Sequence, residues 1–242
     1  MKKLLVPFCL TLIIFIGSAG VGWSASLKKD LYAERRGDCA TVLREFIPLA
    51  EQKIVTPQAI LGLMYREGQG LPQDYKTAVS WLKLAAEPGD ACAQAILGLM
   101  YYWGEGVPEN DKTAVKWLKL AAEQGVATAQ HHLGLMYQSG SGVPENQKTA
   151  VKWLKLAAEQ GDAYPESQQN LAFRYEDGWG VKKDLVYAYM WHSISKTNGL
   201  VEPGDMGMLM LEFEMTPSQI ETAKKLAREC VRKNYKSREG GC

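Results

Sequence analysis

Two nearly identical stretches of the chain decide its fold. Residues 107–125 read VPENDKTAVKWLKLAAEQG, and residues 143–161 read VPENQKTAVKWLKLAAEQG. They differ only in having Asp111 or Gln147, and they lie 36 residues apart. Such self-similarity at a fixed spacing is typical of repeat proteins, in which each unit is one supersecondary element.

The repeat extends beyond these stretches in both directions. Gly62-Leu63-Met64-Tyr65 recurs as Gly98-Leu99-Met100-Tyr101 and as Gly134-Leu135-Met136-Tyr137, again at a spacing of 36 residues. A fourth copy follows at a spacing of 38 residues and is degraded, with Ala172 in place of the glycine. The residues predicted to form the repeated core are Gly62, Tyr65, Trp81, Gly98, Tyr101, Trp117, Gly134, Tyr137, Trp153, Tyr175 and Trp191.

Each unit predicts a pair of α-helices. The front helix is expected over residues 91–102, where apolar and small residues recur at helical spacing, and Gly104 follows its end. Asn110, a favourable N-cap residue, begins the rear helix. Glycine inside a helix costs about 1 kcal/mol relative to alanine, so the recurrence of Gly98 predicts a close neighbouring helix. Because one unit cannot bury its own apolar stripe, the units are expected to stack.

This pattern resembles the Sel1-like repeat family, a relative of the tetratricopeptide repeat. The family pattern Ala-Gln-x-x-Leu-Gly-x-x-Tyr, Gly-x-Gly-Val, Ala-x-x-Trp and Ala-Ala-x-x-Gly is present here between Ala93 and Gly125. The resemblance implies an all-α fold, a right-handed α/α superhelical solenoid of helix-turn-helix repeats with a period of 36 residues. It also implies a binding role, because similar proteins act as adaptors in exported, envelope or signalling pathways.

The chain is expected to begin with a secretory signal peptide. A start with two lysines, an apolar run over residues 4–17 and a tail of small residues are typical of such a segment. An uncleaved anchor is the alternative. Cleavage predicts a periplasmic or secreted protein with no stable membrane insertion. The expected regions are a signal peptide at 1–25, N-terminal capping helices at 26–56, four repeats at 57–199 and C-terminal capping helices at 200–242.

The charge of the chain argues against nucleic acid as a partner. Removal of residues 1–25, which hold two lysines and no acid, changes the formal net charge from +1 to −1, whereas nucleic-acid-binding domains are strongly basic. No cofactor is predicted. No metal site is predicted either, because His131 and His132 point about 100° apart on a helix and His192 is the only other histidine.

Variable positions within otherwise matching copies are the candidates for partner recognition. Residues that differ between copies are not needed for the framework, and aromatic and arginine side chains dominate interface hot spots. The alternative is that these positions vary by neutral drift on an exposed face. The predicted partner, a protein or peptide, would contact the concave face that the front helices line in related repeats. The residues predicted to bind it are Arg66, Tyr102, Trp103, His131, Gln138 and Glu176.

Cysteines allow one predicted disulfide after export into an oxidising compartment. Cys230 and Cys242 are the expected pair, because the Gly240-Gly241 segment lets the tail fold back to a helix end. Cys39 and Cys92 begin helices of opposite direction, so their Cα atoms are expected to exceed the roughly 7 Å limit for a disulfide. We therefore expect that neither of these two cysteines forms a disulfide.

Two other functions compete with protein binding. Some cysteine-rich members of the family have been linked to penicillin binding, so distant analogy allows a hydrolase acting on cell-wall or β-lactam substrates. Ser80 with Lys83 and Ser193 with Lys196 have the Ser-x-x-Lys spacing, but no partner motif accompanies them. The chain is therefore expected not to be an enzyme. A third possibility is a structural envelope component held through the lysine-rich outer faces of the rear helices.

Overall fold

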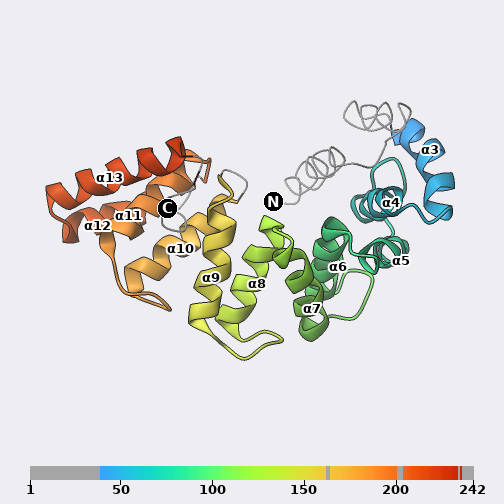
Figure 1. Ribbon diagram of the computed structural model, residues 1–242, viewed down its shortest axis with the longest axis horizontal. Coiled ribbons are helices and arrows are strands. Elements are labelled where there is room, and N and C mark those ends of the chain that lie inside the picture. Colours follow the sequence, from blue (N-terminus) through green and yellow to red (C-terminus); the bar gives the residue numbers. More distant parts are fainter. Residues whose placement is uncertain (1–38, 162–163, 201–203, 234, 236–242) are drawn as a thin grey trace. The chain divides into compact units, whose positions relative to one another are not determined.

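The computed structural model describes residues 39–161, 164–200, 204–233 and 235, and the side chains of 39–42, 45 and 204–206 are outside this description. The described residues form eleven α-helices and no β-strand, which confirms the predicted all-α fold (Figure 1). The chain divides into two compact units, residues 1–120 and 121–242.

Front and rear helices alternate along the repeats, and within each unit consecutive helices pack against each other. The front helices are α4 (Val55–Glu67), α6 (Ala91–Trp103), α8 (Ala127–Ser139) and α10 (Pro165–Asp177). The rear helices are α5 (Tyr75–Ala86), α7 (Asp111–Glu123), α9 (Gln147–Ala158) and α11 (Leu185–Thr197). The terminal helices are α3 (Cys39–Glu51), α12 (Gly204–Glu214) and α13 (Pro217–Arg232).

The turn inside each repeat closes in the same way. In the second repeat Gly104 adopts φ 69°, a left-handed conformation that glycine takes without a Cβ clash, and caps α6. The N–H of Asn110 then donates to the carbonyl of Tyr101 at 2.8 Å, and the Asn110 side chain accepts from the N–H of Thr113 at 2.9 Å. The structure thus confirms the predicted turn and N-cap. The residues that donate to the equivalent tyrosine carbonyls are Asp74, Asn146 and Asp184.

The recurring glycine lets the front helix approach its own rear helix. An ideal Cβ placed on Gly98 would lie 2.7 Å from Leu118 Cγ, and one on Gly134 would lie 2.8 Å from Leu154 Cγ. This confirms the close approach that the recurring glycine predicts. The fourth repeat changes both partners together, since the glycine becomes Ala172 and the leucine position is occupied by the buried His192.

The repeated tryptophans differ in burial. Trp191 is completely buried and Trp153 nearly so, whereas Trp81 and Trp117 are only partly buried. The Lys116 ammonium lies 5.6 Å from the centre of the Trp117 ring. Trp117, predicted as part of the repeated core, packs against the core cluster of the first unit but is only partly buried. In its helix the deep positions are held by smaller residues such as Leu118 and Ala121.

Both ends of the described chain continue the repeat packing. Phe46 and Ala50 of α3 are buried against α4, as the rear helix of a leading half-unit would be. At the other end α12 and α13 both pack on α11 (Figure 1). Helix α13 begins with a capping box, in which Thr216 and Gln219 bond reciprocally. Ala227 and Cys230 of α13 cover Trp191, which explains why this tryptophan is the most buried of the four.

Candidate protein-binding surface

The six residues predicted to bind a partner differ widely in exposure. Trp103 is 44% exposed, whereas Arg66 and His131 are each only 6% exposed. The remaining three side chains are partly buried; they are Tyr102, Gln138 and Glu176. Arg66 and His131 therefore offer little surface to a partner. Binding at all six positions stays a prediction.

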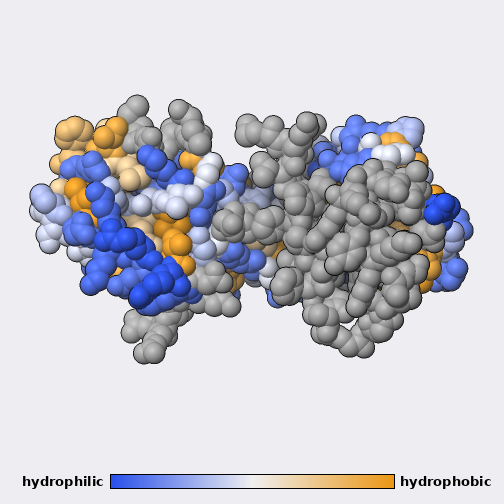
Figure 2. All heavy atoms as spheres, turned by 90° about the horizontal axis from the view of Figure 1, so that it is seen from above, coloured by the Kyte–Doolittle hydropathy of each residue, from blue (hydrophilic) through white to orange (hydrophobic). Residues whose placement is uncertain are grey.

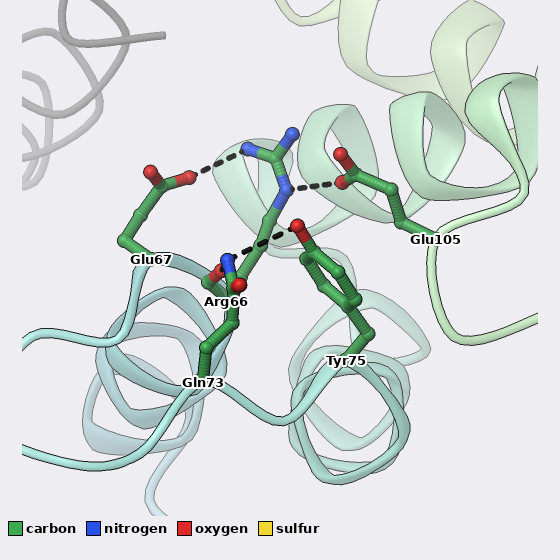
Figure 3. A network of polar contacts seen from close by, with 5 residues as sticks. All are labelled: Arg66, Glu67, Gln73, Tyr75 and Glu105. Atoms are coloured by element: carbon green, nitrogen blue, oxygen red, sulfur yellow. Dashed lines mark hydrogen bonds and ion pairs between the residues drawn. The ribbon is translucent and has the colours of Figure 1, made fainter.

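Arg66 organises a network between the first and second repeats, which Figure 3 shows from close by. Its Nε donates to Glu105 Oε2 at 2.8 Å, and its Nη1 donates to Glu67 Oε1 at 3.0 Å. The guanidinium carbon also lies 5.7 Å from the centre of the Trp103 ring, within cation–π range. The structure thus brings Arg66 and Trp103 together. Arg66 holds the exposed indole in place while its own charge is paired.

The loop between α4 and α5 is hydrogen-bonded to the same network. Gln73 Nε2 donates to the backbone carbonyl of Arg66 at 2.7 Å and to the Tyr75 hydroxyl at 3.0 Å. Gly106 of the next repeat lies directly on Tyr75, since a Cβ there would be 2.5 Å from the Tyr75 carbonyl. The second glycine of the Gly-x-Gly motif is therefore required for one repeat to seat on the preceding rear helix.

A second arginine–tryptophan pair occurs in the other unit and was not predicted. Arg174 is buried, and its guanidinium carbon lies 5.4 Å from the centre of the Trp179 ring. Trp179 is 55% exposed, and Arg174 Nη1 donates to Gln147 Oε1 at 2.8 Å. The available signal was Trp179 itself, a large aromatic between Gly178 and Gly180 where the other copies have a polar residue.

His131 belongs to a buried polar contact between the third and fourth repeats. Its Nδ1 lies 2.7 Å from the Ser167 hydroxyl, and its ring centre lies 4.6 Å from that of Tyr164. Burial lowers the pKa of His131 to about 3, and the neighbouring His132 adds to this effect. The imidazole is therefore neutral at physiological pH. Its position makes it a packing residue between α8 and α10.

Glu176 also makes an internal contact. Its Oε2 lies 3.4 Å from Nε2 of His192, whose pKa burial lowers to about 4. Burial and the neighbouring Asp177 and Glu214 carboxylates raise the pKa of Glu176. Phe173 packs edge-on against His192, with 5.0 Å between the ring centres. Together these residues connect α10 to α11.

A row of buried glutamines is the main structural feature that the predictions missed. Gln94 Nε2 donates to the carbonyl of Ala86 at 3.0 Å and so joins the front helix α6 to the end of the preceding rear helix α5. Gln58, Gln130 and Gln168 donate in the same manner to the carbonyls of Ala50, Ala122 and Ala158. The signal was present in the family pattern, which has a fixed Ala-Gln pair.

Other chemistry has little structural support in the described part of the chain. No group of three or more His, Cys, Asp or Glu side chains there could hold a metal ion. The Ser80 hydroxyl donates to the Lys76 carbonyl of its own helix at 3.1 Å. No helix within the described ranges has the length and apolar character needed to cross a membrane. Cys242 lies outside these ranges, so its disulfide with Cys230 stays a prediction, as does the expectation for Cys39 and Cys92.

Comparison with known proteins agrees with this geometry. The Sel1 repeat model matches residues 58–90, 93–126, 127–162 and 165–200, more than half of the chain. No curated protein matches the chain. A protective antigen of uropathogenic Escherichia coli with an SLR fold is similar in structure, with a TM-score of 0.74, 33% identity and 81% of this chain covered. The match spans 41% of the antigen.

A second solved structure points to the same family. It is a Sel1 repeat protein from Oxalobacter formigenes, with a TM-score of 0.65 and 31% identity. The match covers 71% of this chain and 69% of that protein. Sel1 repeats generally mediate protein–protein interactions, and structural relatives of this kind are typically non-catalytic scaffolds. The matched segments, the helix pairs and these two structures agree, and the chain belongs to the Sel1 repeat family.

Proposed function

We propose that the chain is an exported scaffold that binds a segment of another protein through the surface of its front helices and the loops that follow them. This is the surface that the family resemblance predicts to be concave. Trp103 is the observation that carries the proposal, because its indole is 44% exposed yet held by a buried arginine. Tryptophan and arginine are enriched in binding hot spots.

Preorganisation makes Trp103 a better anchor than an isolated surface tryptophan. Arg66 is fixed by two carboxylates, at 2.8 and 3.0 Å, so the face of the indole that stacks on it has a defined position. A side chain that is already ordered loses less conformational entropy on binding. Trp179 and Arg174 repeat this arrangement in the other unit and are the second proposed anchor.

The proposed export rests on the sequence of residues 1–25, which lie outside the described residues. Their basic start and apolar run support entry into the secretory pathway, which would place the repeats in the periplasm or outside the cell. Fractionation of the native cells tests this part. Recovery of the processed chain from the envelope or medium is expected, and an unprocessed chain in the cytoplasm would contradict export.

Pull-down from an envelope extract of the native cells tests the binding surface. The bait proteins are the wild-type chain, Trp103→Ala, and Leu84→Ala as a matched control from the exposed side of α5. We expect a partner whose recovery falls at least about tenfold with Trp103→Ala and stays unchanged with Leu84→Ala. Equal recovery with both variants would contradict a role for this surface.

A further inference from the structure

Helix α12 presents apolar side chains to solvent at the end of the repeats. Leu209 is 53% exposed, Met210 61% and Phe213 89%. Leu211, on the opposite side of the helix, and Met215, just after its end, are buried in one cluster with Tyr189 of α11. Figure 2 shows hydrophobic surface at the end of the molecule that α12 and α13 form. A helix that caps a repeat array normally has a polar outer face, whereas this face of α12 is apolar.

The three exposed residues form one stripe. With about 3.6 residues per turn, Leu209, Met210 and Phe213 lie on a common face of α12. The same spacing puts Glu212 on one side of the stripe and Glu214 on the other. The Glu212 carboxylate accepts from the Tyr189 hydroxyl at 2.7 Å, which fixes its position beside the stripe.

Negative charge accumulates on the Glu214 side of the stripe. Burial raises the pKa of Glu176 at the end of α10, and the nearby carboxylates of Asp177 and Glu214 raise it further. These three acidic groups therefore lie close together. Lys183 pairs with this group, with its Nζ 4.0 Å from Glu214 Oε2. Both groups of that pair are more than half exposed, so the pair gives little stabilisation. The border of the stripe is thus acidic on both sides.

We propose that α12 binds a basic amphipathic helix of another protein, a surface distinct from the one proposed around Trp103. The apolar side of that helix packs on Leu209, Met210 and Phe213. Its lysine or arginine side chains extend along the stripe and pair with Glu212 and Glu214. Helices commonly bind to proteins in this way, through apolar anchors at helical spacing, and methionine adapts its shape to different partners.

The charges favour this occupant over two others. An anionic lipid surface would be repelled by carboxylates on both sides of the stripe. A two-fold contact between α12 and its copy in a second molecule would bring Glu212 and Glu214 beside the same acidic groups. A basic helix instead neutralises both borders while it covers the apolar residues.

Titration with a synthetic amphipathic peptide tests the proposal. The probe is a helical peptide of leucine and lysine with leucines on one face, and its matched control has glutamate in place of every lysine. Fluorescence anisotropy of labelled peptide is measured with the wild-type chain, Phe213→Ser, the double variant Glu212→Lys/Glu214→Lys, and Leu84→Ser as a distant exposed control. Circular dichroism checks that each variant is folded.

We expect the lysine peptide to bind the wild-type chain and Leu84→Ser equally. Phe213→Ser should weaken binding by about 30-fold, as loss of a central aromatic does, and the charge reversal should weaken it at least as much. The reversal should also let the glutamate peptide bind. Equal binding of both peptides to the wild type would overturn the proposal. So would concentration-dependent dimers or binding to anionic vesicles that Phe213→Ser abolishes, since these assign the stripe to a second copy or to lipid.

Discussion

Gly98 and Leu118 determine how closely the two helices of a repeat can pack. The glycine has no side chain, and the leucine of the rear helix fills the space where a Cβ would be. Protein interiors are packed at the density of organic crystals, so this contact has no spare volume. In the fourth repeat both positions change together, because Ala172 replaces the glycine and His192 replaces the leucine, and both side chains are buried.

Gly98→Ala is therefore expected to destabilise the chain by about 1–3 kcal/mol, even though alanine normally favours a helix by about 1 kcal/mol over glycine. The added Cβ would lie 2.7 Å from Leu118 Cγ, so α7 must move away from α6. Urea denaturation of both proteins measures the change. The penalty should shrink when Gly98→Ala is made in a Leu118→Ala background. An unchanged penalty there would show that the predicted clash is absent.

Helices α8, α10 and α11 are joined by neutral histidines. His131 of α8 contacts Ser167 of α10, and His192 of α11 contacts Glu176 of α10. Desolvation disfavours the charged form of an imidazole buried in this way. The packing of these three helices therefore depends on pH, because protonation would place a positive charge on a buried imidazole.

The stability of this helix group is expected to fall with pH. The folded-state pKa values are about 3 for His131 and about 4 for His192, both below the usual 6.5. The unfolded state therefore binds more protons, so stabilisation is full above pH 6.5 and is lost as the pH falls toward the folded values. Each histidine should contribute a loss of about 1 kcal/mol per pH unit between pH 6 and 5.

Thermal unfolding of the wild type and His131→Gln across this range measures the effect. Glutamine keeps a polar group beside Ser167 but does not titrate, so the variant should lose less stability on acidification. Parallel curves for the two proteins would rule out His131 as a source of the pH dependence. Carboxylates with raised pKa values, such as Glu159, act in the opposite direction and affect both proteins equally.

In the second repeat the helix positions were predictable from the sequence to within one or two residues. A glycine C-cap ends its front helix and an asparagine N-cap begins its rear helix, as Gly104 and Asn110 do for α6 and α7. The binding surface was less predictable. Trp103 was recognised from its variability, but its stacking on Arg66 depends on how two successive front helices align, which no local pattern encodes. Burial of His131 was missed for the same reason.

Within each of the two units, stability comes from contacts between neighbours in the sequence. Consecutive helices of a unit pack against each other, and buried glutamines such as Gln94 link a front helix to the end of the preceding helix. The stability of such an array is close to a sum of repeat stabilities and nearest-neighbour interfaces. The sequence could predict this arrangement because the repeats are nearly identical. It could not predict the apolar outer face of α12, where the repeat pattern has ended.

Disruption of α13 should therefore unfold the chain from one end. Ala223 is completely buried against α11, so Ala223→Lys places a charge in an apolar contact and should cost more than about 2 kcal/mol. Hydrogen exchange measured by mass spectrometry should accelerate strongly in α11 and α13, less in α10, and not at all in α4 and α5. The exposed neighbour Lys224→Ala should leave every helix protected. If α4 and α5 lost protection together with α11, the chain would unfold as a single cooperative body, and stability would not spread from neighbour to neighbour.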